Sequence, residues 1–71
     1  MNTEEIKQRM RPGFRPFVLH LDDGRKFEIA HPEFILVGKS VVVVLRNDDL
    51  TETLDAEHIV SVEDLNPKTP R

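Results

Sequence analysis

The segment Arg15–Ile29 constrains the fold of this chain most strongly, because its apolar residues alternate on both sides of a turn. The apolar positions are all odd-numbered: Phe17, Leu19, Leu21, Phe27 and Ile29. Side chains alternate between the two faces of a strand, so the five share a face only if paired residue numbers add up to an even number. A three-residue turn, Asp22-Asp23-Gly24, meets this condition, and a two-residue Asp23-Gly24 turn does not.

The three-residue turn also fits the backbone preferences of its residues. It is a type I turn followed by a left-handed residue, the position that Gly24 can occupy without strain. This turn pairs Leu19 with Phe27 on the inner face. The outer face then pairs His20 with Lys26 and Val18 with Glu28, and we expect that mostly polar face to be exposed to solvent.

A short helix is expected before this hairpin. Asn2 can cap it, with Glu5 three residues further on as in a capping box, and Ile6 and Met10 would share one face. Pro12 and Gly13 end it near Arg11. Such a short helix is not stable alone, so we expect it to dock on the open end of a β structure.

The remaining chain reads as short strands with close turns. Strands are expected at 34–37, 40–46, 50–54 and 59–63, with a break at 31–33, turns at 38–39 and 47–49, and a helical turn at 55–58. The predicted fold class is mainly β (a small α+β protein): a short N-terminal helix followed by a five- to six-stranded antiparallel barrel of the SH3 or Sm type. We expect residues 1–65 to form the single domain and residues 66–71 to form a flexible tail.

Three pieces of sequence carry a family resemblance. They are Arg15-Pro16-Phe17, then Leu19-x-Leu21-x-Asp23-Gly24-Arg25-x-Phe27, then His31-Pro32-Glu33-Phe34. In this order they resemble an uncharacterised family of short bacterial proteins that is common in planctomycetes. The resemblance covers about residues 3–63 and implies a small β-barrel domain. It implies no activity, substrate or catalytic residue.

A looser likeness is to the bacterial Sm-like RNA chaperone. That family also places a short helix before a strand, a Gly turn and a second strand, and it has a His near the start of the last strand, where His58 lies here. The Sm-like pattern has Lys before that His, and Lys helps to hold RNA. Here Glu57 precedes His58, which disfavours RNA binding by that mode.

Length and composition exclude several classes of protein. The chain has 71 residues and no cysteine, so disulfides and cysteine-based zinc sites are absent. No apolar run approaches the roughly 18 residues of a membrane span, and residues 1–10 lack the apolar region of a signal peptide. We therefore expect a soluble cytoplasmic protein that does not bind membranes.

Charge is unevenly distributed along the chain. Residues 1–26 have six basic against four acidic residues, a charge of +2, whereas residues 27–64 have two against nine, a charge of −7. The acidic main body disfavours general binding to a phosphate backbone. The candidate site for an anion or nucleic acid is a local basic patch near the N-terminus, formed by Lys7, Arg9, Arg11, Arg15, Arg25 and Lys26.

No pattern in the sequence indicates catalysis. The three histidines, at positions 20, 31 and 58, lie on different elements without ligand spacing, and the pairs Asp22-Asp23 and Asp48-Asp49 suit turns. Ser40 and Ser61 lack a nucleophile-elbow motif. We expect no enzyme activity, no metal and no cofactor.

The run Val41–Leu45 is the strongest candidate for an interaction surface. One face of this strand must belong to the core, and the other is either enclosed by the curvature of a barrel or meets a partner. Val41, Val43 and Leu45 are the candidate interface residues. The favoured function is a protein-interaction or oligomerisation module, whose partner is another protein or a second copy in a homodimer. The alternative is an Sm-like RNA-binding protein that uses the basic patch.

Overall fold

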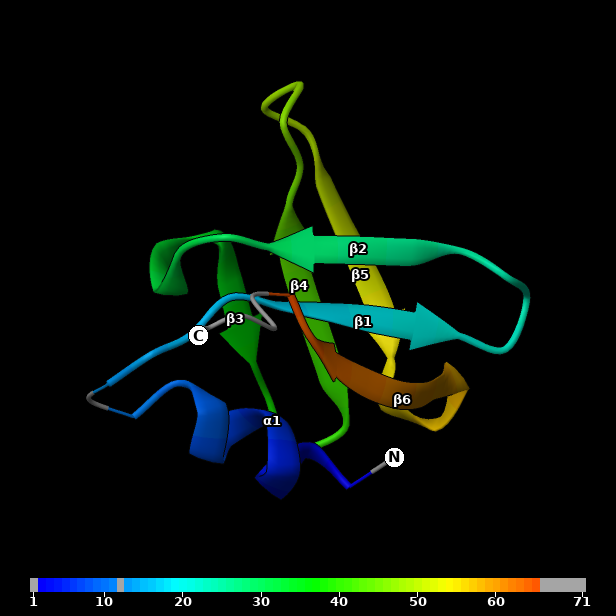
Figure 1. The fold of residues 1–71 in the computed structure, drawn as a ribbon. Coiled ribbons are helices and arrows are strands. Elements are labelled where there is room, and N and C mark those ends of the chain that lie inside the picture. Colours follow the sequence, from blue (N-terminus) through cyan, green and yellow to red (C-terminus); the bar gives the residue numbers. More distant parts are fainter. Residues whose placement is uncertain (1, 12, 66–71) are drawn as a thin grey trace.

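The computed structural model describes residues 2–11 and 13–65, which form one short helix, six strands and two 3₁₀ turns. The predicted tail at 66–71 lies outside the described residues. Figure 1 shows the elements in chain order. They are α1 (Thr3–Arg9), β1 (Phe17–Leu21), β2 (Lys26–Ile29), η1 (Pro32–Phe34), β3 (Ile35–Val37), β4 (Val41–Leu45), β5 (Thr51–Asp55), η2 (Ala56–His58) and β6 (Ile59–Asp64).

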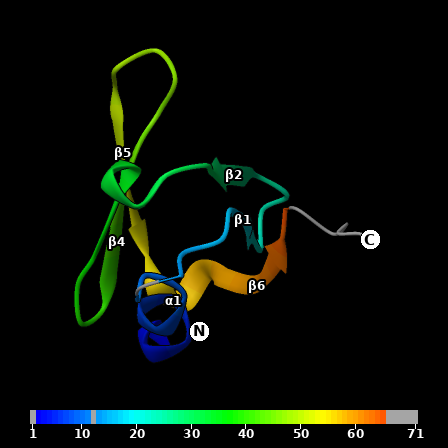
Figure 2. The same cartoon turned by 60° about the vertical axis from the view of Figure 1, so that its left-hand side comes forward.

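The strands form two antiparallel sheets of three strands each. One sheet has the order β2-β1-β6 and the other the order β3-β4-β5. The sheets face each other with their strands crossing at a steep angle, and the β4–β5 hairpin projects beyond β2 (Figures 1 and 2). The protein is therefore a mainly β, small α+β domain. The described strands do not close into one sheet, so the predicted barrel is not confirmed.

The register of the first hairpin is confirmed. Phe17 pairs with Ile29, and Leu19 pairs with Phe27. The backbone N–H of Leu21 donates to the carbonyl of Arg25 at 2.9 Å, and Gly24, at φ 92°, donates to the carbonyl of Leu21. Asp22-Asp23-Gly24 is thus the three-residue turn that the odd-numbered apolar residues require.

The core lies between the two sheets. It is built from the inward faces of both sheets and from the helix, because alternate residues of each strand point inward. Its members are Ile6, Phe17, Leu19, Leu21, Ile29, Ile35, Val42, Val44, Leu54 and Ile59. Phe14 and Phe27 pack against this cluster from its border. One apolar core therefore holds the helix and both sheets together.

Helix α1 covers the open side between the sheets, as predicted (Figure 2). Ile6 is completely buried, the hydroxyl of Thr3 donates to the carbonyl of Lys39 in the β3–β4 turn, and Arg9 forms an ion pair with Asp64 of β6. The Asn2 side chain caps the helix by accepting from the N–H of Glu4, one residue earlier than a capping box with Glu5 requires. The helix thereby contacts both sheets.

Val18 departs from the expectation of a solvent-exposed outer face on β1, because only 5% of it is exposed. It lies on the central strand of its sheet, between Glu28 of β2 and Glu63 of β6. A short side chain flanked on both sides by longer ones is shielded by its neighbours. Sequence alternation alone did not predict this, because the pairing of β1 with β6 joins distant parts of the chain.

Candidate functional site

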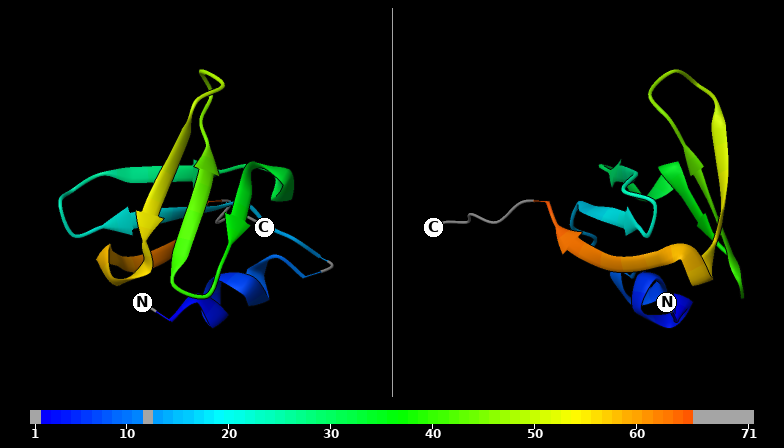
Figure 3. Two further views of the ribbon diagram at one scale, coloured as in Figure 1. Left: turned by 180° about the vertical axis from the view of Figure 1, so that it is seen from behind. Right: turned by 90° about the vertical axis from the view of Figure 1, so that its right-hand side faces the viewer.

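The outer face of the β3-β4-β5 sheet carries the apolar residues that were predicted to form an interface. Val42 and Val44 point into the core, so Val41, Val43 and Leu45 lie on the opposite face. Val41 is 43% exposed, and Val43 and Leu45 are half-buried. Viewed from behind, no other described element lies across this sheet (Figure 3). The face is therefore not the inner wall of the described fold.

Leu36 belongs to the same face, although it was not among the predicted interface residues. It pairs with Val43 and is 70% exposed, the most exposed of the large apolar residues in the described part of the chain. The register of the β3–β4 hairpin pairs even-numbered residues of β3 with odd-numbered residues of β4. This register was the missing signal, because it decides that Leu36, rather than Ile35, points outward. We call Leu36, Val41, Val43 and Leu45 the outer apolar stripe.

The six residues of the predicted basic patch do not gather in one place. Arg9, Arg11 and Arg15 line a notch of about 350 Å³ beside α1, which we call the helix notch. Glu5 and Asp64 line the same notch. Lys7 is exposed on α1 and does not line it. The helix notch therefore combines three guanidinium groups with two carboxylates.

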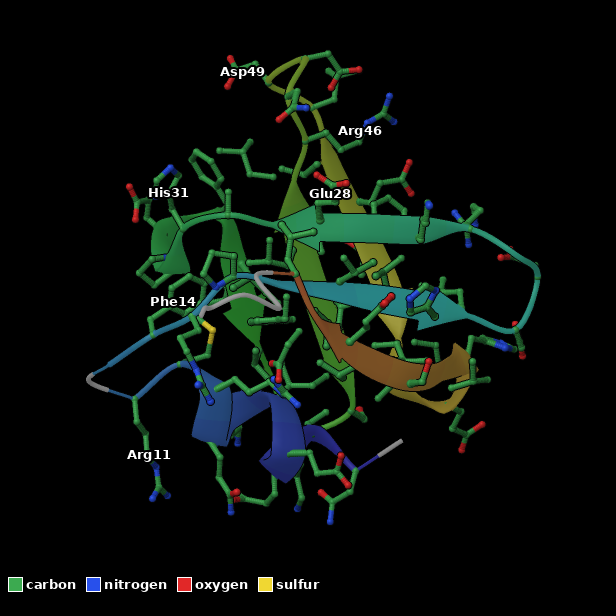
Figure 4. All side chains as sticks on the ribbon, viewed as in Figure 1. Arg11, Phe14, Glu28, His31, Arg46 and Asp49 are labelled. Atoms are coloured by element: carbon green, nitrogen blue, oxygen red, sulfur yellow. The ribbon has the colours of Figure 1, made fainter. Side chains whose placement is uncertain are left out.

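Arg25 and Lys26 lie at a different site, a cleft of about 810 Å³ between β2 and the β4–β5 hairpin. We call it the β2 cleft. Phe27, Phe34 and Val44 line it together with charged residues. Figure 4 shows Glu28 on β2 and Arg46 on the projecting β4–β5 hairpin, far from Arg11. The β2 cleft thus joins an apolar floor to a charged rim.

Ion pairs occupy most charges on that rim. Arg46 donates to Glu52 at 3.0 Å and to Asp48 at 2.7 Å, and Arg25 donates to Asp23 at 2.8 Å. The backbone N–H of Arg25 chiefly holds the pKa of the Asp23 carboxyl below its ordinary value, and the Arg25 guanidinium adds to this effect. These contacts make Arg25 and Arg46 structural partners of nearby carboxylates.

Two of the histidines form contacts with carboxylates. His58 Nδ1 lies 2.9 Å from Asp22 Oδ2, and His20 Nε2 lies 2.8 Å from Glu63 Oε1. The hydrogen bond to Asp22 raises the pKa of His58, and the charges of Asp22, Asp55 and Glu57 act in the same direction. The His58–Asp22 contact joins η2 to the β1–β2 turn, so its evident role is to hold that turn in place.

Both aspartate pairs lie in turns, as predicted. Asp23 accepts from the backbone N–H of Arg25, and Asp48 accepts from that of Leu50. Such side-chain to backbone bonds are the usual reason for Asp in turns. Within residues 2–11 and 13–65, no group of three or more His, Asp or Glu side chains is placed to hold a metal ion.

Comparison of the chain with protein-family models, with curated proteins and with solved structures gave no match. The described residues contain no helix that is long and apolar enough to span a membrane.

Proposed function

We propose that this protein is a non-enzymatic protein-interaction module that docks through the outer apolar stripe. The observation that carries the proposal is the exposure of Leu36 beside its cross-strand partner Val43. A sheet with one solvated face ordinarily presents polar residues there. Contiguous exposed apolar residues rimmed by polar ones are typical of protein contact surfaces.

The chemistry around the stripe supports a protein partner. On β5, Thr53 lies opposite Val43, and Thr51 lies opposite Leu45. Hydroxyl groups beside an apolar stripe match the mixed character of protein interfaces, with an apolar centre and a polar border. Full burial of an exposed leucine or valine side chain contributes about 1.5–3 kcal/mol. Covering Leu36 and Val41 together therefore provides a useful part of a binding free energy.

The test compares charge insertion on and off the stripe. Leu36→Lys and Val41→Lys place a cation on it, and Val60→Lys is the matched control because Val60 is 57% exposed on β6 of the other sheet. Each protein is used as bait for binding partners, and bound partners are then titrated by calorimetry. We expect a partner that binds the wild type and Val60→Lys with equal affinity. Leu36→Lys should bind this partner with an affinity at least tenfold lower. Equal binding by Leu36→Lys would contradict the proposal.

A second part of the proposal concerns the type of β fold. We propose that the domain is an opened relative of the small SH3- and Sm-like barrels. Three features support it: β6 returns to pair with β1, a 3₁₀ turn precedes β6, and a short helix covers the open side. The absence of cysteine is consistent with a cytoplasmic location, which we also propose.

RNA binding at the helix notch is the second candidate. Its support is the convergence of Arg9, Arg11 and Arg15, since guanidinium groups pair well with phosphate. The Arg9–Asp64 ion pair opposes it, because Asp64 already occupies one of the three cations. Salt-sensitive binding of single-stranded RNA that Arg11→Glu and Arg15→Glu abolish would support this function. Absence of binding at low salt would exclude it.

A further inference from the structure

We infer that the free edge of β2 pairs with β2 of a second copy of this chain. The two strands run antiparallel about a twofold axis at Phe27, and the two β2-β1-β6 sheets become one sheet of six strands. This surface is separate from the outer apolar stripe, which lies on the other sheet. The inference therefore goes beyond the function proposed above and does not depend on it.

The backbone of β2 provides the first half of the argument. The pair Leu21 and Arg25 is hydrogen-bonded across the hairpin, and hydrogen-bonded pairs alternate with non-bonded ones in an antiparallel ladder. Phe27 therefore directs its N–H and C=O toward β1. Lys26 and Glu28 direct theirs away from β1, toward the free edge. In an antiparallel pair centred on Phe27, Lys26 faces Glu28 of the second copy. The backbone N–H and C=O groups of these two residues then bond to each other, once on each side of the twofold axis.

Charge provides the second half of the argument. The same register places each Lys26 side chain directly across from a Glu28 side chain, twice per dimer. Opposite charges directly across two strands stabilise the pair, and like charges destabilise it. Neither residue forms a salt bridge within the described chain. Lys26 and Glu28 are therefore available to a partner, and the β2 edge is complementary in charge to itself.

The other edge strands lack this self-complementarity. On β5 and β6 the charged residues are all acidic: Glu52 and Asp55 on β5, and Glu63 and Asp64 on β6. Antiparallel self-pairing of these strands gains no opposite charges. Strand β3 has no charged residue, and α1 packs against it. Among the described edges, only β2 carries one cation and one anion placed symmetrically about a central residue.

The β2 cleft leaves space along this edge. Residues 25–28 form one wall of the cleft, and Phe34 and Val44 contribute apolar surface opposite. In the proposed register the two Phe27 residues form a non-hydrogen-bonded pair, the arrangement in which side chains approach most closely. Contact between the two rings adds apolar burial to the strand pairing. One strand pair is a small interface, so we expect a weak dimer that forms at high protein concentration.

Charge reversal with mixing tests the inference. Sedimentation equilibrium from micromolar to millimolar concentration should show the wild-type mass rising from 8.2 kDa toward twice that value. Lys26→Glu alone and Glu28→Lys alone each place like charges across both pairs, and each should weaken the dimer roughly tenfold or more. An equimolar mixture of these two variants restores opposite charges at both positions. We therefore expect the mixture to associate as well as the wild type. Lys39→Glu, on an exposed turn, is the control and should dimerise normally.

Amide exchange supplies a second, residue-specific readout. Pairing should slow exchange at Lys26 and Glu28 as concentration rises, whereas Phe27 is protected by β1 in the monomer as well. A strict monomer at millimolar concentration overturns the inference, and so does failure of the mixed variants to associate. Loss of the dimer in Leu36→Lys but not in Lys26→Glu also overturns it and assigns self-association to the outer apolar stripe. If the protein dimerises through β2 but no partner binds the outer apolar stripe, only the proposed function is refuted.

Discussion

Two hydrogen bonds between Asp22 and His58 hold the β1–β2 turn against the 3₁₀ turn η2. The N–H of Asp22 donates to the carbonyl of His58 at 2.9 Å, and the Asp22 carboxylate contacts the His58 ring. The two bonds connect residues 36 positions apart. The side-chain bond depends on the charge of His58, whereas the backbone bond does not.

This difference predicts a dependence of stability on pH. The pKa of His58 is raised in the folded protein, so the contact stabilises the fold fully below about pH 6.5, the ordinary pKa of histidine, while Asp22 is ionised. The stabilisation is lost as the pH rises through the raised pKa. We expect Asp22→Asn to lower the free energy of unfolding in mild acid and to have little effect in alkaline solution.

Urea unfolding at several pH values measures this difference, and an NMR titration should show the pKa of His58 moving toward its ordinary value in Asp22→Asn. Asp49→Asn is the control, because it makes the same chemical change in a turn that contains no histidine. A difference between Asp22→Asn and the wild type that does not vary with pH would contradict the prediction.

Gly24 permits a second prediction at this scale. Its φ is 92°, and a Cβ built there meets no atom within 4 Å, so a substitution is opposed by backbone conformation and not by crowding. Gly24→Val should therefore lower the free energy of unfolding by roughly 1–2 kcal/mol. Gly24→Asn should cost less, because Asn tolerates left-handed geometry. Urea unfolding followed by circular dichroism compares the two. Equal costs would show that the left-handed conformation is not the cause.

At the scale of elements, the local ones could be predicted from the sequence. The hairpin register followed from the odd-numbered apolar residues and a single glycine, and the break between β2 and β3 followed from Pro32. These signals are local, because turn geometry and side-chain alternation act over a few residues. The exposure of Leu36 and the burial of Val18 depend on strand partners elsewhere in the chain. For that reason the burial of Val18 was predicted wrongly and the exposure of Leu36 was missed.

Helix α1 illustrates an element that exists through its packing. Its seven residues are too few for a stable isolated helix, and Ile6 is its fully buried contact with the core. Ile6→Ala should lower the free energy of unfolding by about 2–5 kcal/mol. Lys7→Ala, on the exposed side of the same helix, should change it by less than about 0.5 kcal/mol. Thermal unfolding by circular dichroism measures both, and similar costs would show that Ile6 does not anchor the helix.

At the scale of the whole molecule, both sheets and the helix share one core. Ile6, Leu19 and Val42 come from α1, β1 and β4 and belong to the same buried cluster. We therefore expect the two sheets to unfold together. In the wild type, the NMR signals of Leu19 and Val42 should disappear at one common urea concentration. In Ile6→Ala the two signals should again disappear together, at a lower concentration. Separate midpoints for the two sheets would contradict a common core.

The arrangement of the candidate sites also belongs to this scale. The basic residues of the first 26 positions are close in sequence, yet the fold places Arg11 and Arg25 at different clefts. The reason is that β1 carries the chain across the molecule, so Arg11 lies before this strand and Arg25 lies after the turn at its far end. The shared face of Val41, Val43 and Leu45 could be predicted, because alternation along one strand fixes which residues lie on the same side. Sequence alone did not show which strands flank it.

The pairing of β1 with β6 has a consequence for the order in which the chain folds as it is made. Strand β1 emerges from the ribosome before β2 to β5, but its second neighbour, β6, emerges after all of them, and His20 contacts Glu63 across 43 positions. Until residues 59–64 emerge, one side of β1 has no partner, and contacts this distant in sequence form slowly. A nascent chain stalled before Ile59 would present a bare apolar strand edge. Because an unpaired strand edge is a site for aggregation, pairing with β6 removes a hazard that the partly synthesised chain carries.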